Sequence, residues 1–359
     1  MTSEIKNTYW SIINKGYINY PILNQNEKCD VVVIGGGISG CLTAYLLSQY
    51  NLNTILIDKS FIAGGGTYNS IGVLENKTDF SLNTLAELIG EKKAIRAEKL
   101  CKKAVDTLEN VLYHINHPHI FQRKDFEYIY KDSGKELSRN CGIIDPFKLC
   151  HVLLKASLKK NARVYENTSA VGYDYYSNNI RVNIGNSNYI ECKKIIFTDV
   201  SSSYKLIKEW ELLEFRHSYT IITDSLEDTA TNYMKKHLIL KEDEDLYTYI
   251  RPTCDKRLMI SEFNGGSQPD KNSKLLHKLE NILSFSQNLR VEYSLEKIYG
   301  QSPDGLPYIG EHPKFNDCYF NLALGRNHIC YSLIGAEIIK DLILYESNPD
   351  AEIFSFERN

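Results

Sequence analysis

Apolar and polar positions near the start of this chain predict a strand, a glycine turn, a helix and a second strand. Residues 29–34 read Cys-Asp-Val-Val-Val-Ile, which is typical of a strand buried in a parallel sheet. A glycine-rich turn over 35–40 leads into residues 41–50, whose apolar positions recur at helical spacing. A second strand over 54–58 ends on an acid, Asp58. Together these elements predict one βαβ unit.

The rest of the pattern predicts a mixture of helices and short strands. Apolar residues at three-and-four spacing indicate a long helical region over 81–115, and Pro146 opens a helix over 145–160. Two more helices are expected near 271–286 and at 334–345. Runs rich in β-branched or alternating residues predict strands at 121–130, 162–165, 170–175, 180–184, 194–198, 219–223, 247–250, 258–261 and 318–322.

This order of elements predicts an α/β fold in which two domains interleave. The expected class is a doubly wound, Rossmann-like dinucleotide-binding domain with an α+β substrate domain built on an antiparallel or mixed sheet. Residues 1–28 are expected to form a leader anchored by aromatic residues. The predicted boundaries are 29–83, 141–215 and 299–359 for the dinucleotide-binding domain, and 84–140 and 216–298 for the substrate domain.

Composition narrows the class of protein. The chain has 359 residues, 43% of them hydrophobic, and a net charge of -3, which argues against extended disorder and a nucleic-acid partner. Residues 31–57 carry no charged side chain, but glycines and amides divide them into short apolar blocks, so we predict no membrane span. The first 28 residues show no secretory signal pattern, and a cytoplasmic location is expected.

The nine cysteines are scattered and form no pair or cluster at metal-binding spacing. A dispersed, odd set in a chain without a signal pattern indicates reduced and mostly buried thiols. We therefore expect neither a disulfide framework nor a metal site.

The glycine turn carries the first candidate chemistry. In Gly35-x-Gly37-x-x-Gly40, the first glycine permits a tight turn, the second admits a pyrophosphate and the third allows close packing of helix and strand. Asp58 follows at the distance expected of a carboxylate that binds an adenosine ribose. A second glycine-rich loop, 62–74, could follow an extended cofactor. The βαβ unit alone leaves NAD and FAD open.

Blocks across nearly the whole chain now suggest a family. The most specific is Ser-Pro-Asp-Gly-Leu-Pro-Tyr-Ile-Gly at 302–310, followed by Gly-Arg-Asn-His-Ile at 325–329, and segments 30–40, 66–74 and 168–171 accompany it. In these segments the sequence resembles the FAD-dependent amino-acid and amine oxidoreductases that include D-amino-acid oxidase, glycine oxidase and sarcosine oxidase. The resemblance implies FAD, bound non-covalently, rather than NAD.

The resemblance also implies which residues contact the cofactor, from the pyrophosphate to the ribose, the adenine and the flavin ring. These residues are Gly35, Gly37, Ile38, Ser39, Gly40, Asp58, Lys59, Gly66, Thr67, Ile71, Gly72, Val73, Val171, Arg326, Asn327, His328 and Ile329.

By the same resemblance, the chain is expected to be an amine or amino-acid oxidase or dehydrogenase. The neutral substrate amine would pass a hydride from its α-carbon to flavin N5, and the imine would hydrolyse. Oxygen would usually reoxidise the flavin and yield hydrogen peroxide, although another electron acceptor stays open. The expected partners are a small amine or amino acid and this acceptor, and the oligomeric state is not predicted.

Candidate catalytic residues lie where the sequence departs from the family pattern. Tyr299 stands where relatives hold the substrate carboxylate with an arginine, and tyrosine cannot replace that bidentate pairing. Arg251 could take over, although we favour a surface arginine at a strand end. His328 replaces a glycine and lies either beside the isoalloxazine or as a neutral spacer facing solvent. With Arg326, these residues are the predicted catalytic group. Asp199 replaces another glycine and could oppose the phosphates.

Two other interpretations stay open at this point. The departures at Tyr299, Asp199 and His328 would permit a flavin-binding or degenerate member of the family that acts as a partner protein with weak or no oxidase activity. An NAD-linked dehydrogenase would share the βαβ unit.

Overall fold

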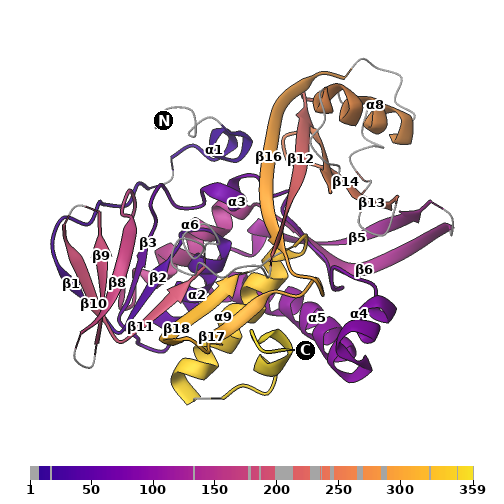
Figure 1. Ribbon diagram of the computed structural model, residues 1–359. Coiled ribbons are helices and arrows are strands. Elements are labelled where there is room, and N and C mark those ends of the chain that lie inside the picture. The colour runs from indigo at the N-terminus through magenta and orange to yellow at the C-terminus, as the bar shows by residue number, and fades with distance from the viewer. Residues whose placement is uncertain are drawn as a thin grey trace.

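The structure is a computed structural model, and its described residues form three sheets with helices packed on them (Figure 1). The described residues are 8–16, 18–131, 134–176, 179–185, 187–198, 213–226, 235, 237–242, 246–264, 270–283, 289–322, 325–345 and 347–358.

The central sheet is parallel except at one edge, where β17 runs antiparallel to β18. Its strands, in spatial order, are β17 (Tyr308–His312), β18 (Phe315–Leu322), β11 (Lys194–Phe197), β2 (Val31–Ile34), β3 (Thr54–Ile57) and β7 (Ala162–Tyr165). All four residues of β2 are buried, as expected of a strand covered on both faces. The predicted α/β class is confirmed.

Helices cover one face of this parallel sheet. They are α2 (Ile38–Gln49), flanked by α6 (Pro146–Ser157) and α9 (His328–Tyr345), and they pack on Val33. The alternate side chain, Ile34, packs on the opposite face against a small sheet. In spatial order that small sheet contains β1 (Glu27–Lys28), β10 (Tyr189–Cys192), β9 (Asn179–Ile184) and β8 (Ala170–Tyr176).

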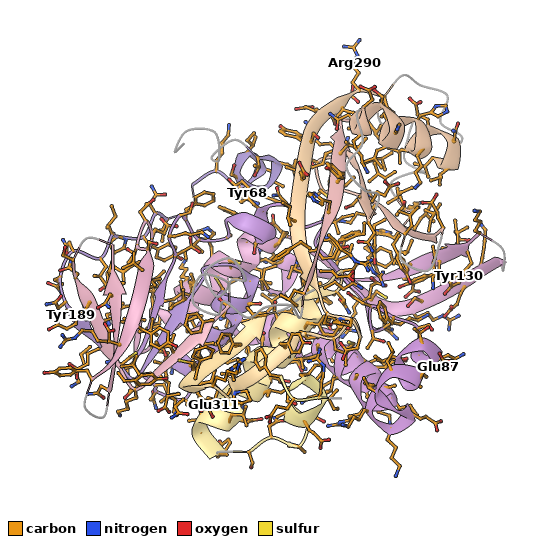
Figure 2. The ribbon with its side chains drawn as sticks, viewed as in Figure 1. Tyr68, Glu87, Tyr130, Tyr189, Arg290 and Glu311 are labelled. Carbon is orange, nitrogen blue, oxygen red and sulfur yellow. The ribbon has the colours of Figure 1, made fainter. Side chains whose placement is uncertain are left out.

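A large mixed sheet forms the other half of the molecule. Its strands, in spatial order, are β16 (Val291–Gln301), β12 (Glu214–Thr223), β15 (Leu258–Phe263), β14 (Tyr247–Pro252), β13 (Leu238–Lys241), β5 (Phe121–Tyr130), β6 (Gly134–Ile144) and β4 (Val73–Leu74). Helix α8 (Lys271–Leu283) covers one face with Leu275 and Leu279. The opposite face carries Tyr249 and Tyr299 into the same core as α2. Figure 2 shows Arg290 at the far tip of this half and Tyr189 on the small sheet at the other end of the molecule.

Several predicted elements need correction. Gly90, with φ of +86°, divides the predicted helical region 81–115 into α4 (Leu82–Ile89) and α5 (Glu91–His114). Helix α9 begins at His328, six residues before the predicted start at Ile334. By contrast, α6 begins as predicted, because the Asp145 side chain accepts the backbone N–H of Lys148 and Pro146 takes the first helical position.

Some elements were not predicted at all. They include α1 (Tyr9–Ile13), α3 (Gly65–Tyr68), the short turns η2 (Pro118–Ile120) and η5 (Ala351–Phe354), and strands β1, β4, β6, β10, β13, β16 and β17.

The aromatic anchors of the leader are confirmed by Tyr9 and Trp10, which are fully or nearly buried. The prediction of unpaired and mostly buried thiols is also confirmed, since all nine cysteines are free and every one except Cys254 is buried. Among the described helices, none is long and apolar enough to cross a membrane. The domain boundaries stay a prediction.

Candidate active site

The turn between β2 and α2 places backbone N–H groups at the carboxyl end of the parallel sheet. Gly35 has φ of +115°, which favours glycine. A Cβ on Gly40 would lie 1.8 Å from the carbonyl oxygen of Gly35, so no side chain fits there. Gly37 is the N-cap of α2, whose first N–H groups can bind an anion. The turn therefore has the geometry expected of a pyrophosphate-binding turn, and its contacts with the cofactor stay a prediction.

Asp58 lies at the tip of the next strand, β3, beside this turn. Its Oδ2 accepts the backbone N–H of Gly36 at 2.7 Å, and its Oδ1 accepts that of Ser60 at 2.7 Å. Both oxygens are thus fixed by the backbone, while the neighbouring Lys59 is exposed. The contacts of Asp58 and Lys59 with an adenosine ribose stay a prediction.

Two further elements reach the N-terminus of α2. The Thr67 hydroxyl, in α3, accepts the backbone N–H of Ile38 at 3.0 Å. The Ser39 and Ser332 hydroxyls lie 2.7 Å apart and link α2 to α9. The start of α2 therefore meets the second glycine loop and the C-terminal helix, which are far apart in the sequence.

The loop that follows α3 is held against the large sheet. Gly72 has φ of +69°, and a Cβ there would lie 2.2 Å from the carbonyl oxygen of Ile144. The backbone N–H of Ile144 donates to the Gly72 carbonyl at 2.8 Å. Ile71 and Val73 on either side are buried. This backbone fixes the path of the residues that we expect along the flavin ring.

The segment that opens α9 is bound by a buried acid, Asp79. Its Oδ2 accepts the backbone N–H of Arg326 at 2.7 Å, and its Oδ1 accepts that of Asn327 at 3.1 Å. Burial raises the pKa of the Asp79 carboxyl, and the Arg326 charge opposes this effect. Gly325 must lack a side chain, because a Cβ there would lie 1.8 Å from Asp79 Oδ2. Ile329 follows as a fully buried residue of α9.

Asn327 then joins α9 to the glycine loop. Its Oδ1 accepts the backbone N–H of Glu75 at 3.0 Å, and its amide donates to the carbonyls of Glu75 at 2.7 Å and Lys77 at 2.9 Å. These hydrogen bonds hold together residues that are 252 positions apart in the chain. The two halves of the predicted flavin site are brought together.

The Arg326 side chain lies in a buried cluster of acidic and phenolic groups. Its Nη1 donates to the Tyr249 hydroxyl at 2.6 Å and lies 3.7 Å from a Glu75 carboxylate oxygen. The guanidinium stacks 3.5 Å from the ring centre of Tyr247. Glu75 accepts the hydroxyls of Tyr128 and Tyr249. Burial raises the pKa of both of these tyrosines well above its ordinary value.

The members of this cluster other than Arg326 were missed by the sequence analysis. Tyr247 and Tyr249 carried a signal, because alternate residues of the predicted strand must face the same side. Glu75 and Asp79 carried none, since only the fold brings them to Arg326.

Lys297 and His328 form a buried pair beside the glycine loop. The Lys297 Nζ lies 3.5 Å from the His328 Nδ1, and a Cβ on Gly66 would lie 3.3 Å from the Lys297 Cε. Burial lowers the pKa of Lys297 to about 8, against the opposing effect of Asp79. Burial, together with the Lys297 charge, holds the pKa of His328 well below its usual range.

His328 is a correction to one of the two sequence interpretations. The side chain is 8% exposed, so a spacer facing solvent is wrong. The residue begins α9 with no left-handed backbone, and this explains how a histidine is accommodated where relatives favour glycine. Lys297, its partner, was not predicted as a site residue.

Tyr299 and Arg251, the other predicted catalytic residues still to be placed, have different partners. The Tyr299 hydroxyl donates to Asn264 Oδ1 at 2.5 Å, and its ring packs on Phe263. Arg251 is 4% exposed, so the favoured interpretation of a surface arginine is wrong. Its Nε donates to the Ile71 carbonyl at 2.6 Å, which places it against the loop before β4.

Two further residues were predicted to lie near the cofactor, Val171 and Asp199. Val171, in β8, is 63% exposed on the small sheet, and its contact with the adenine stays a prediction. Asp199 lies outside the described residues, and its effect on the phosphates stays a prediction.

Comparison with known proteins identifies the family. The FAD dependent oxidoreductase family profile matches residues 30–139 and 130–342, so the chain belongs to this family. A curated relative, glycine oxidase of Bacillus licheniformis, is 21% identical over 364 residues, which cover 90% of this chain and 95% of the relative.

Solved structures with the same fold belong to enzymes that are named for different substrates. L-amino acid deaminase from Proteus vulgaris superposes with a TM-score of 0.78 at 16% identity, covering 96% of this chain and 97% of that one. L-alpha-glycerophosphate oxidase from Mycoplasma pneumoniae, solved with FAD bound, superposes with a TM-score of 0.67 at 14% identity, covering 90% and 96%. These structures therefore share the fold, and the substrate must be inferred from the site itself.

The residues of this chain fit FAD, the cofactor of the family. The cradle at Gly35, Gly37 and Gly40 cannot accept a Cβ at its third glycine without displacing backbone, and the α2 N-terminus faces it. Asp58 is fixed beside that cradle at the end where a ribose follows a pyrophosphate. At the expected flavin end of the site, Gly66 and His328, the first residue of α9, both lie beside the Lys297 side chain. The predicted FAD cofactor is confirmed.

Lys297 should make the stability of the apoprotein depend on pH. Its pKa is about 8 when folded, against an ordinary value of 10.5, so the unfolded chain binds the extra proton between these values. The Lys297 contribution to the free energy of unfolding should then rise with pH across this window, by about 3 kcal/mol at about 1.4 kcal/mol per pKa unit. Buried thiols such as Cys101 and Cys330, whose pKa burial raises, contribute in the opposite direction. Urea unfolding of the unmodified chain and of Lys297→Met at several pH values between 8 and 10.5 measures the Lys297 contribution as the difference between their pH slopes.

Two variants test that assignment. Relative to the unmodified chain, Lys297→Met should lose the Lys297 contribution to the pH slope, whereas Lys160→Met, at an exposed lysine, should keep it. A Lys297→Met protein with the same pH slope as the unmodified chain would contradict a buried, titrating lysine.

Proposed function

We propose that this protein oxidises the carbon–nitrogen bond of a small amine or amino acid. The observation that carries the proposal is the junction of the 66–79 loop with the opening of α9, made by Asp79 and Asn327. It gathers Arg326, Glu75 and the tyrosines of the large sheet next to the loop expected along the flavin. When bound, FAD supplies the acceptor for a hydride from the substrate α-carbon.

The polar groups of the site favour a substrate that is held by its nitrogen. Glu75 lies at the centre of the cluster and can accept a hydrogen bond from an amine. Arg326 is already engaged by Tyr249, Glu75 and Asp79, and the position of the usual carboxylate-binding arginine is Tyr299. Because a tyrosine stands at that position and the Arg326 guanidinium is engaged, we propose an amine or a weakly held amino acid over a tightly clamped α-amino acid.

Lys297 and His328 would act on the cofactor side of the same space. Their burial excludes water, and a lysine with a pKa of about 8 is in part neutral at mildly alkaline pH. The neutral His328 ring offers a hydrogen-bonding nitrogen whose protonation burial opposes. We expect this pair to set the charge beside the bound cofactor, with oxygen or another acceptor completing the cycle.

A second candidate is a flavin-binding partner protein with little oxidase activity. The observation that favours it is the buried Lys297–His328 pair. The family pattern has a glycine at position 328, so the histidine side chain fills space that is open in that pattern. The experiment is anaerobic reduction of the FAD-loaded protein by a panel of amines, N-methyl amino acids, cyclic imino acids, α-amino acids and glycerol 3-phosphate. Bleaching by an amine or amino acid supports the proposed oxidation of a carbon–nitrogen bond, and bleaching by no compound of the panel supports the partner protein.

A further inference from the structure

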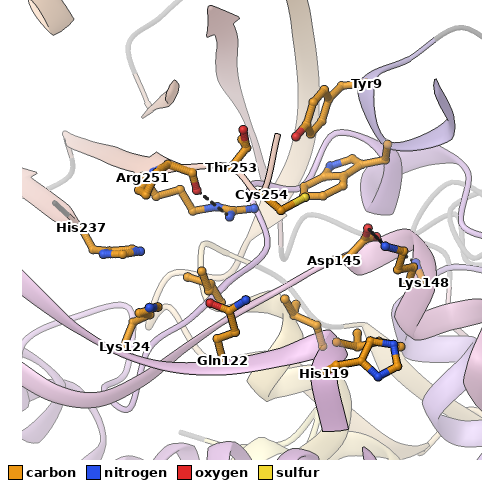
Figure 3. Close-up of a pocket in the computed structure, with 15 residues that line it drawn as sticks. Tyr9, His119, Gln122, Lys124, Asp145, Lys148, His237, Arg251, Thr253 and Cys254 are labelled. Carbon is orange, nitrogen blue, oxygen red and sulfur yellow. Dashed lines mark hydrogen bonds and ion pairs between the residues drawn. The ribbon is translucent and has the colours of Figure 1, made fainter. Parts of the chain in front are cut away.

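A second cavity lies outside the candidate active site. It has a volume of about 230 Å³ and is lined by residues of α1, the start of β5, the end of β6 and the end of β14 (Figure 3). Of all the predicted site residues, Arg251 alone lines it. The residues that bear on its chemistry are Trp10, Gln122, Lys124, Asp145, His237 and Arg251.

Arg251 brings a buried guanidinium nitrogen to this cavity without a partner. The Nε donates to the Ile71 carbonyl at 2.6 Å, and the Nη1 donates to the Pro252 carbonyl at 3.3 Å. The Nη2 has no hydrogen-bond partner among the described residues, although the side chain is 4% exposed. A buried charged donor without a partner is costly, and a bound anion would remove that cost.

His237 repeats this feature beside Arg251. Its Nδ1 lies 3.3 Å from the Lys235 carbonyl, while its Nε2 has no partner within the part of the chain that the structure describes. Burial, together with the positive charges of Lys124 and Arg251, lowers the pKa of His237 to about 4. Figure 3 shows Arg251 and His237 opposite Gln122 and Lys124 of β5.

The net charge of the lining is positive. Lys124, Lys148 and Arg251 are cations, whereas Asp145 is the acidic residue that lines the cavity. The Asp145 oxygens are already engaged, because they accept the Lys148 backbone N–H at 2.9 Å and the Asn14 amide at 2.7 Å. The cavity therefore attracts an anion.

Part of the lining is apolar and defines the body of the ligand. Trp10, Ile120, Ile143 and Ile144 line the cavity together with the cations. The volume is that of roughly eight water molecules at about 30 Å³ each, which exceeds the need of a bare inorganic ion. A ligand with one charged end and a short apolar body matches both parts of the lining.

We propose that this cavity binds a small organic carboxylate, with the carboxylate on Arg251 and the apolar body against Trp10. The site goes beyond the proposed function, because Arg326, Glu75 and Tyr249 of the candidate active site do not line this cavity. Arg251 joins the two places through Ile71, and its Nη2 lies 3.2 Å from where a Cβ on Gly72 would be. A ligand that moves the Arg251 side chain would therefore also act on the loop at Ile71 and Gly72.

Calorimetric titration of the FAD-loaded protein with isovalerate tests the site. We expect saturation at one site and at least tenfold weaker binding of the uncharged isovaleramide. Inorganic phosphate should also bind more weakly than isovalerate, because it leaves the apolar lining without a contact. Equal binding of the amide, or tighter binding of phosphate, would overturn the assignment to an organic carboxylate.

Variants separate this cavity from the active site. Arg251→Met should lower the isovalerate affinity at least tenfold, and Arg251→Lys should retain part of it. Lys124→Gln, at a half-buried residue, should weaken binding without a change in thermal stability, and Lys160→Gln should leave it unchanged. In a Trp210→Phe background the remaining tryptophan is Trp10, whose emission should change on saturation. Undiminished affinity in both Arg251→Met and Lys124→Gln, or an unchanged Trp10 emission, would overturn the proposal.

Discussion

Gly40→Ala is expected to abolish the retention of FAD. The new Cβ would lie 1.8 Å from the carbonyl oxygen of Gly35, and no rotamer relieves a clash with backbone. The turn must open, which displaces the α2 N-terminus from the pyrophosphate that it should hold. We expect FAD occupancy to fall at least about tenfold, equivalent to about 1.4 kcal/mol or more of binding free energy. The ratio of flavin to protein absorbance after gel filtration with added FAD measures the loss.

Gly172→Ala is the matched control. A Cβ on Gly172 would meet nothing within 4 Å, and its φ is not left-handed, so this variant should retain FAD fully. Equal FAD content in the Gly40 and Gly172 variants would show that the glycine turn does not hold the cofactor.

Arg326→Met should destabilise the folded protein by about 3–5 kcal/mol, the usual cost of removing one partner from a buried ion pair. Glu75 and Asp79 would stay buried without the cation that faces both. Urea unfolding at neutral pH measures the loss. Adding Glu75→Gln to Arg326→Met should recover part of the stability, because one uncompensated carboxylate is then neutral.

A surface arginine provides the comparison. Arg123 pairs with Asp106 and Glu109 in partly exposed positions, so Arg123→Met should cost less than about 1 kcal/mol. If Arg326→Met costs no more than Arg123→Met, or if Glu75→Gln does not compensate, Arg326 does not neutralise the buried acids.

The nucleotide end of the site could be predicted because its determinants are local. The glycine turn, the helix after it and the acid at the end of the next strand lie within 29–58, and periodicity defines each element. The structure places Gly35, Gly40 and Asp58 together as expected.

The flavin end depends on contacts that sequence patterns do not encode. Asp79 and Glu75 meet Arg326 and Asn327 only after β4 and α9 are packed beside one another. The resemblance supplied Arg326 and Asn327, but no periodicity marked their acidic partners. Strand β16 was missed, and with it the burial of Lys297 next to His328.

Arg251 shows how burial decides between interpretations of one residue. Its position at the end of a predicted strand suggested exposure, yet α1 packs over it, with Trp10 5.6 Å from the guanidinium. The leader that covers it showed no strong pattern of its own, so neither the burial nor the cavity could be predicted.

Anaerobic mixing of the FAD-loaded protein with the amine and amino-acid panel tests the central claim most directly. The proposed function predicts that at least one amine or amino acid bleaches the flavin and that the hydrolysed imine releases one equivalent of ammonia or amine per flavin. A flavin reduced by glycerol 3-phosphate but by no amine or amino acid would contradict this claim. A protein that takes up no FAD would contradict it as well.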